Sequence, residues 1–331
     1  MRKRQINKNG IAFITAVSLL MVFIGTCYSF QENHQETIVF KKIAETDINV
    51  LGNFLDIEED YAYISTQEGL IVFDISDPEN PERTGSLNFG SGFNLDVEGS
   101  FAYILSGGVT VVDIGSPGNY SVVKRYNTNY SNIKIRGSYI FSTVLKKGFE
   151  IIDFSNVSSP EIVGRFYGEG SYSEEWLGYL KFDFSGDYMY LGEADQCIKV
   201  LDISDISNPS KINSIPASNS ITDIVVHGSI LAVGTSNELI LYDISNPESP
   251  ERKASLSGYQ SSHINTDGSI LLFYDDNKTY HYVAVDISNP QSPEVISSYD
   301  PSYSHGMILK GDYLYSISNG LRKLTIFKIN Y

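Results

Sequence analysis

An eight-residue phrase recurs along this chain at a nearly constant interval. It is complete at residues 74–81, 243–250 and 286–293, where it reads Asp-Ile-Ser-Asp/Asn-Pro-x-x-Pro. Looser copies of the phrase begin at Asp113, Asp153 and Asp202. A phrase repeated at a fixed period indicates a chain built from repeated structural units, each of which buries its apolar surface against its neighbours.

The period of the repeat constrains the kind of unit. Successive aspartates of the phrase are 39, 40, 49, 41 and 43 residues apart, and a further step of 42 reaches Lys328. That last copy keeps the apolar run 324–329 and has lost the aspartate. Seven units of about 40–45 residues, each with several short strands, are typical of the blades of a β-propeller.

Each unit divides into four strand signals. In the first unit they lie at 53–57, 61–65, 70–75 and 83–87, separated by short polar turns. The segments are rich in Val, Ile, Tyr and Phe, the residue types that favour strands. The sequence therefore predicts an all-β fold, a seven-bladed β-propeller with four antiparallel strands per blade.

The two ends of the repeat region predict how the ring closes. The last unit has strand signals at 306–309, 313–317 and 324–329 and lacks a fourth, whereas an unpaired signal at 37–43 precedes the first unit. We expect this N-terminal strand to complete the last blade, because such closure removes two exposed sheet edges. The predicted propeller domain spans residues 37–331.

The repeated runs resemble a known family. Residues 69–76 and 282–288, followed by Asn/Asp-Pro-x-x-Pro, are similar to the LVIVD-repeat family of predicted β-propeller proteins of bacterial and archaeal cell surfaces. The resemblance covers residues 37–331, and the copies at Asp113, Asp153 and Asp202 depart from the full pattern. It implies an architecture and a location, and it brings no catalytic residues.

The N-terminus has the pattern of an export signal. Basic residues at 2–8 precede an apolar run of 15 residues at 11–25, which is short for a membrane span of ~20 residues and typical of a secretory signal. We therefore interpret residues 1–26 as a signal peptide, with a lipoprotein signal as one form of it, and residues 27–36 as a polar tether.

Three ways of processing this N-terminus remain open. Residues 23–27 resemble a bacterial lipobox, in which Cys27 becomes lipidated, although Thr26 stands where Gly, Ala or Ser is usual. A cut after Ser29 by an ordinary signal peptidase and an uncleaved anchor are the alternatives. All three place the domain outside the cytoplasm, at the cell surface, secreted or periplasmic, and in contact with a membrane only through its N-terminus.

The charge balance narrows the choice of partners. The formal net charge is −16, and without residues 1–26, which carry four bases and no acid, 20 bases face 40 acids. A surface this acidic repels phosphate groups, which argues against nucleic acid and anionic membrane surfaces as partners. We expect a monomer whose partner is a surface protein or a glycan.

The repeated aspartates are interpreted as structural. They occur once per blade and are therefore spread around a ring, and an Asp followed by Ser and Asn/Asp-Pro can accept backbone N–H groups in the turn that follows the strand.

The innermost strands of the blades present polar residues toward the propeller axis. One position is apolar in each unit: Leu55, Leu95, Ile133, Phe182, Ile224, Ile264 and Met307. The positions on the opposite side of these strands form two rows: Asp56, Asp96, Lys134, Asp183 and Asn265 in one, and Asn94, Asn132, Lys181, Asp223 and His263 in the other. We expect Asp56, Asp96, Asp183 and Asp223 to line a water-filled channel without a cofactor. Such oxygens would suit Ca²⁺, but its ligands must converge to ~2.3–2.6 Å from the ion, and a ring spreads them apart.

The longest step between repeats holds the candidate binding site. Its extra residues fall in the segment 167–179, which connects two blades and contains the sole tryptophan. Aromatic faces beside hydrogen-bond acceptors suit sugar rings or peptides. The predicted binding residues are Tyr167, Tyr172, Glu174, Glu175, Trp176 and Tyr179, joined by His263 and His305 at the start of inner strands. The alternative is an ordinary loop whose Trp176 covers a blade.

These patterns favour an exported, non-catalytic binding module for a protein or glycan ligand, since no nucleophile–His–acid set is recognisable. The alternative is a secreted polysaccharide lyase or hydrolase that uses the channel carboxylates Asp56, Asp96, Asp183 and Asp223. A periplasmic assembly scaffold is a third hypothesis. The identity of the ligand stays open.

Overall fold

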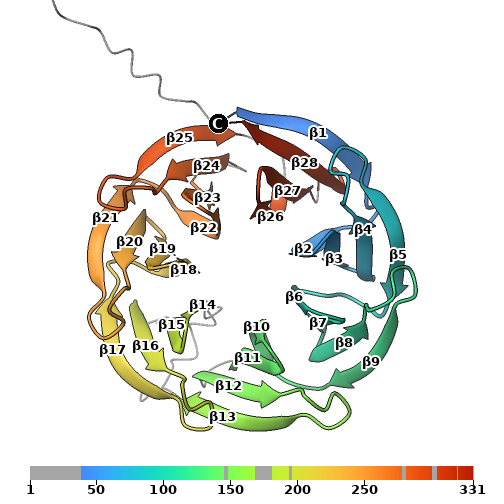
Figure 1. Cartoon of the computed structure of the whole chain (residues 1–331), viewed down its shortest axis with the longest axis horizontal. Coiled ribbons are helices and arrows are strands. Elements are labelled where there is room, and N and C mark those ends of the chain that lie inside the picture. The colour runs from blue at the N-terminus through green and yellow to red at the C-terminus, as the bar shows by residue number, and fades with distance from the viewer. Residues whose placement is uncertain are drawn as a thin grey trace, which may run out of the picture. The chain divides into compact units, whose positions relative to one another are not determined.

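The computed structural model describes residues 39–144, 148–167, 181–193, 196–277, 281–299, 304–318 and 320–330, which belong to one compact unit, residues 37–331. These residues contain 28 strands and no helix. The strands form seven four-stranded antiparallel sheets arranged as the blades of a ring (Figure 1). The prediction of a seven-bladed β-propeller is confirmed.

Each of the first six blades is four strands that follow one another in the sequence. The first three blades are β2 (Gly52–Glu58), β3 (Tyr61–Thr66), β4 (Gly69–Asp74) and β5 (Glu82–Asn88); β6 (Asn94–Glu98), β7 (Phe101–Leu105), β8 (Val109–Asp113) and β9 (Ser121–Tyr126); and β10 (Tyr130–Arg136), β11 (Tyr139–Val144), β12 (Gly148–Asp153) and β13 (Glu161–Tyr167). The next three are β14 (Lys181–Ser185), β15 (Tyr188–Glu193), β16 (Cys197–Asp202) and β17 (Ser210–Pro216); β18 (Ile221–His227), β19 (Ile230–Thr235), β20 (Glu238–Asp243) and β21 (Glu251–Ser257); and β22 (Ser261–Asp267), β23 (Ile270–Asp275), β24 (His281–Asp286) and β25 (Glu294–Tyr299).

The seventh blade joins the two ends of the propeller. Strands β26 (Ser304–Lys310), β27 (Tyr313–Ser318) and β28 (Lys323–Asn330) are completed by β1 (Val39–Asp47). β1 pairs antiparallel with β28, from Val39 opposite Asn330 to Asp47 opposite Lys323, and the two strands lie together at the rim (Figure 1). Closure by the N-terminal strand is confirmed.

The core consists of apolar layers between consecutive blades. The third strands are buried on both faces, because each is covered by two neighbouring blades, and β4 has five buried residues in succession. The layer between the last and first blades combines Ile317 and Ile326 with Ile64 and Phe73. Burying one such side chain stabilises the fold by about 1.5–3 kcal/mol. The position of the inner strands that is apolar in every unit is buried in all seven blades.

The repeated phrase forms the turn between the third and fourth strands. In each of its six copies the Oδ1 atom of the aspartate accepts the backbone N–H two residues later, at 2.7–2.9 Å. The structural interpretation of these aspartates is confirmed.

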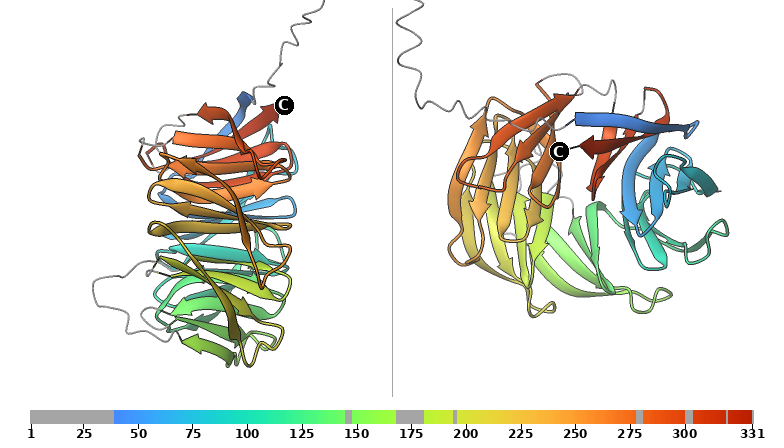
Figure 2. Two further views of the ribbon diagram at one scale, coloured as in Figure 1. Left: turned by 90° about the vertical axis from the view of Figure 1, so that its left-hand side faces the viewer. Right: turned by 45° about the horizontal axis from the view of Figure 1, so that its top comes forward.

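Because neighbouring strands of each blade are antiparallel, the two faces of the propeller carry different connections. Figure 2 shows the propeller from the side. One face carries the connections from the outermost strand of a blade to the innermost strand of the next, and we call it the crossover face. The opposite face carries the turns after the innermost strands and the repeated phrases, and we call it the turn face.

Candidate functional site: the central channel

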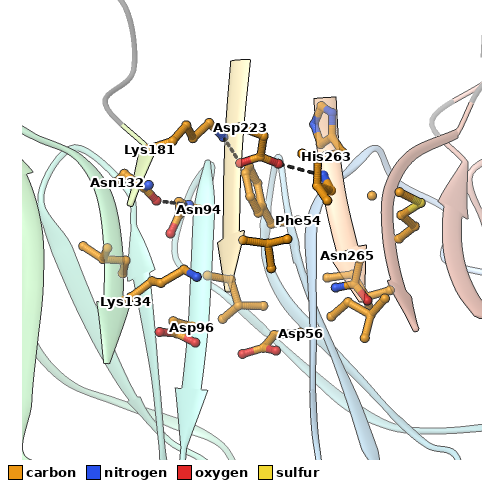
Figure 3. Close-up of a pocket in the computed structure, with 18 of the residues that line it drawn as sticks. Phe54, Asp56, Asn94, Asp96, Asn132, Lys134, Lys181, Asp223, His263 and Asn265 are labelled. Atoms are coloured by element: carbon orange, nitrogen blue, oxygen red, sulfur yellow. Dashed lines mark hydrogen bonds and ion pairs between the residues drawn. The ribbon is translucent and has the colours of Figure 1, made fainter. Parts of the chain in front are cut away.

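The inner strands of the seven blades surround a cavity of about 240 Å³ on the propeller axis. Its lining alternates between apolar residues of the buried position and polar residues that point inward (Figure 3). Each inner strand contributes residues two apart, because strand side chains alternate between faces. The polar lining therefore forms two rings at different depths.

The upper ring lies nearer the crossover face, where the inner strands begin. It consists of Phe54, Asn94, Asn132, Lys181, Asp223, His263 and Gly306. The lower ring lies two residues further along each strand. Its cavity-lining members are Asp56, Asp96, Lys134, Val225, Asn265 and Ile308. Asp183 occupies the same position in the fourth blade and contacts the ring through Lys134.

Four acceptors of the lower ring each link one blade to the next. Asp56 Oδ2 accepts the N–H of Val97 at 2.8 Å, and Asp96 Oδ2 accepts that of Ile135 at 2.5 Å. The other links of this kind join Asp183 Oδ2 to the N–H of Val226 at 2.7 Å and Asn265 Oδ1 to that of Leu309 at 2.7 Å. The channel carboxylates that the sequence suggested for chemistry thus hold the ring together.

The first two carboxyl groups of the lower ring interact with each other. Burial raises the pKa of Asp56, and burial together with the negative charge of Asp56 raises the pKa of Asp96 well above its ordinary value. Two adjacent carboxyl groups in one narrow channel favour a state in which they share a proton.

A cation follows the two carboxyl groups in the lower ring. Lys134 Nζ lies 2.6 Å from Asp183 Oδ1. Burial acts to lower the pKa of Lys134, but the charge and hydrogen bond of Asp183, together with the charges of Asp96 and Asp223, outweigh it and the pKa is raised. The lower ring is therefore largely neutralised by its own members.

The upper ring is less tightly bonded. Lys181 Nζ lies 3.9 Å from Asp223 Oδ1, an ion pair beyond hydrogen-bond distance. Asn94 Nδ2 donates to Asn132 Oδ1 at 3.0 Å, whereas the Oδ1 atom of Asn94 is buried and has no hydrogen-bond partner. This ring holds unused hydrogen-bonding capacity.

His263 stands in an unusual backbone conformation at the channel wall. Its φ of 49° falls in the left-handed region, within a bulge of β22 between Ser262 and Asn265. Its ring packs edge-on against Tyr274, with the ring centroids 5.5 Å apart. Backbone strain at a residue that lines a cavity is a recognised pointer to a functional position.

The predicted loop site is described only in part. Tyr167 is 45% exposed at the end of β13 and donates its hydroxyl to the buried carboxylate of Glu150. Tyr172, Glu174, Glu175, Trp176 and Tyr179 lie outside the described residues, as do Cys27 and the side chain of His305. The proposed grouping of these side chains stays a prediction.

Phe93 was not anticipated from the sequence. It is 61% exposed on the crossover face, one residue before Asn94 of the upper ring. An exposed aromatic side chain beside a polar cavity could have been suspected from the run Gly92-Phe93-Asn94 at a blade junction.

In the part of the chain that the structure describes, no three His, Cys, Asp or Glu side chains form a group that could hold a metal ion. Among the same residues there is no helix of the length and apolarity needed to cross a membrane.

Solved structures share the fold at low sequence identity. The β-propeller domain of Cps50 (Swd1) from Myceliophteria thermophila superposes with a TM-score of 0.69 at 10% identity, covering 88% of this chain and all of that one. The computationally designed protein Ika8 gives a TM-score of 0.61 at 12% identity, covering 87% and 99%. At these identities the likeness concerns the propeller fold alone.

Sequence comparison identifies the repeat itself. No curated protein matches the chain. The family model described as LVIVD repeat matches at residues 46–88, 90–128, 129–167, 183–215, 220–257 and 278–301, which together make up more than half of the chain. The first five matches each span most of one blade, in agreement with the repeat period. The chain belongs to the LVIVD-repeat family.

Proposed function

We propose that this propeller is an exported binding module without catalytic chemistry, and that its ligand, a protein or a glycan, binds on the crossover face over the mouth of the channel. The N-terminal sequence, whose pattern we interpret as an export signal, supports a location outside the cytoplasm.

The observation that carries this proposal is the contrast between the two rings. Four acceptors of the lower ring accept an N–H from the next blade. The upper ring contains a link of this kind at Asp223, and it also contains a buried acceptor without a partner and an ion pair at 3.9 Å. The exposed rings of Phe93 and Tyr167 lie on the same face. Pockets that bind small groups combine apolar surface with a few convergent polar groups.

The second candidate is a secreted polysaccharide lyase or hydrolase. The raised pKa of Asp96 favours it, because the carboxyl group of a general acid needs a pKa above its ordinary value. Against it, Asp56 and Asp96 each have an oxygen engaged by the N–H of the next blade. We therefore rank the binding module first.

Arrays of glycans and of peptides, probed with the full-length chain, test the proposal, with turnover assays on every hit. We expect saturable binding without turnover, weakened by Phe93→Ser. The matched control is Val123→Ser, which removes a similarly exposed apolar side chain from the outer strand β9. Turnover that Asp96→Asn abolishes would overturn the proposal in favour of the enzyme.

A further inference from the structure

The upper ring combines an unusual variety of polar groups in a small space. Within it lie the amides of Asn94 and Asn132, the ammonium of Lys181, the carboxylate of Asp223 and the imidazole of His263 (Figure 3). The cavity of about 240 Å³ lies below the roughly 300–1,000 Å³ of pockets that take drug-sized ligands. The space therefore suits a group about the size of a single ring.

Two atoms of the upper ring can form new hydrogen bonds. The Oδ1 atom of Asn94 is a buried acceptor without a partner, so a ligand that donates to it removes a desolvation cost already present in the free protein. Lys181 Nζ has three N–H donors, and its contact with Asp223 at 3.9 Å is an ion pair without a hydrogen bond. The ring thus offers an acceptor and a donor to the same ligand.

Asp223 is a fixed acceptor beside them. Its Oδ1 atom accepts the N–H of Ile224 at 3.0 Å, and its Oδ2 atom accepts that of Ile264 in the next blade at 2.8 Å. These two bonds hold the carboxylate in place and leave each oxygen a second lone pair. A ligand donor meets a carboxylate that is already oriented, which lowers the entropic cost of binding.

The chemistry of these groups selects for hydroxyls. A hydroxyl both donates and accepts, so neighbouring hydroxyls can donate to Asn94 and Asp223 and accept from Lys181. Lys181 and Asp223 carry opposite charges side by side, so the attraction of either one for a charged ligand is offset by repulsion from the other, and the ring gives no net preference for an anion or a cation. The aromatic ring of Phe54 also lines the cavity and supplies an apolar surface.

We propose that the upper ring binds one neutral sugar residue, held by Asn94, Lys181 and Asp223 against Phe54. The proposal rests on the binding function proposed above and narrows its ligand to a glycan. The sugar enters from the crossover face, and the ring of inter-blade links below forms the floor of its site.

The test uses methyl glycosides of glucose, galactose, mannose and N-acetylglucosamine as probes. The full-length protein is labelled at its histidine rings and titrated by NMR. We expect at least one glycoside to shift the signal of His263, which lines the cavity, and to leave that of His227, exposed on the turn face, unchanged. Asn94→Leu and Lys181→Met should each weaken that binding about tenfold or more.

Matched controls separate the site from general effects of substitution. Asn88→Leu and Lys211→Met make the same chemical changes at exposed positions of the outer strands β5 and β17 and should leave the affinity unchanged. Thermal unfolding of each variant shows whether it is folded, and the His263 shift in the wild-type protein tests the site without any variant.

The outcomes distinguish this inference from the proposed function. If no glycoside moves His263, and a peptide or protein binds in a manner that depends on Asn94 and Lys181, the sugar assignment is wrong and the binding module stands. If neither sugars nor peptides bind the channel face, both proposals fail.

Discussion

Residues at equivalent positions of successive blades form different interactions in this propeller. At the lower ring position Asp96 and Asn265 accept an N–H from the next blade, whereas Lys134 forms an ion pair. The sequence places all three in one row facing the axis. It does not reveal the links between blades, because these depend on the distance between strands that are about 40 residues apart in the chain.

The substitution Asp96→Asn is expected to stabilise the protein at neutral pH. Asparagine keeps the acceptor for Ile135, as Asn265 does for Leu309 in the sixth blade, and removes the charge that faces Asp56. Relieving an unfavourable buried charge is worth on the order of 1 kcal/mol, or roughly 2 °C in melting temperature. Thermal unfolding at pH 7 measures it.

The raised pKa of Asp96 also determines how the stability of the folded protein changes with pH. Because the folded-state pKa of Asp96 is raised above its ordinary value of 3.8, the folded protein binds more protons than the unfolded chain as pH rises above that value. The stability of the wild-type protein therefore decreases with rising pH across this window. Asp96→Asn should flatten the decrease. Its control, Asp183→Asn, breaks the ion pair with Lys134 and should destabilise; equal effects of the two substitutions would contradict the assignment.

For the aspartate of the repeated phrase we predict the opposite pH dependence: its contribution to stability increases with rising pH. Hydrogen bonds from the hydroxyl and N–H of Ser76 lower the pKa of Asp74. Its contribution to stability is therefore present above the unfolded-state pKa and is lost as pH falls toward the folded-state value. We expect Asp74→Ala to cost up to about 1 kcal/mol at pH 7, and Asp74→Asn to cost less, since the amide oxygen can still accept the N–H. Chemical denaturation at pH 7 and pH 3 compares them; equal losses from both variants would contradict this explanation.

At the scale of the strands, the sequence predicts nearly the whole architecture. The strand signals at 61–65 and 83–87 correspond to β3 and β5 with differences of one residue at their ends. Local patterns of apolar residues suffice because equivalent strands lie in the same environment in every blade, with the third strand buried and the fourth largely exposed. Bulges are the exception: the left-handed conformation of His263 arises within a non-glycine sequence that carries no turn signal.

Removal of β1 tests the closure of the ring. Deleting residues 39–47 removes the partner of β28 and leaves its edge unpaired. It also removes Ile43 and Ala44, which pack against the layer between the last and first blades, and the 2.6 Å contact of Glu45 with Lys323. We expect a loss of several kcal/mol and self-association through the open edge.

Melting temperature and gel filtration together measure this effect. The exposed side chain of Val39 provides the control, since Val39→Ser leaves the pairing with Asn330 intact and should change neither quantity. A truncated protein that stays monomeric with an unchanged melting temperature would show that β1 does not close the ring.

At the scale of the whole molecule, the sequence predicts the ring better than the site. The channel residues can be counted from the repeat, but their pairing between neighbouring blades depends on which side chains meet after closure. Lys181 and Asp223 belong to consecutive blades, 42 positions apart in the sequence, and their contact follows from the packing of β14 beside β18. In a closed repeat protein the sequence therefore shows which residues occupy equivalent positions in the channel, but only the structure shows which of them contact each other.

Closure also predicts that the point at which the chain begins is exchangeable. Val39 and Asn330 face each other in an antiparallel pair, so a two-residue Asn-Gly turn can join them as a hairpin. A permuted chain that opens between Asn127 and Thr128, in the connection from β9 to β10, then has seven blades each made of strands consecutive in sequence. We expect it to fold, because connections between blades lie at the surface and tolerate new termini.

The matched control is the unpermuted chain of residues 39–330. The permuted protein should melt within a few degrees of this control and remain monomeric, because every pairing and every inter-blade link is retained and one covalent connection replaces another. A large fall in melting temperature would show that the connection between the second and third blades orders the ring in a way that the other connections do not. The stability of the propeller would then depend on that one connection, and the seven contacts between neighbouring blades would not be equivalent.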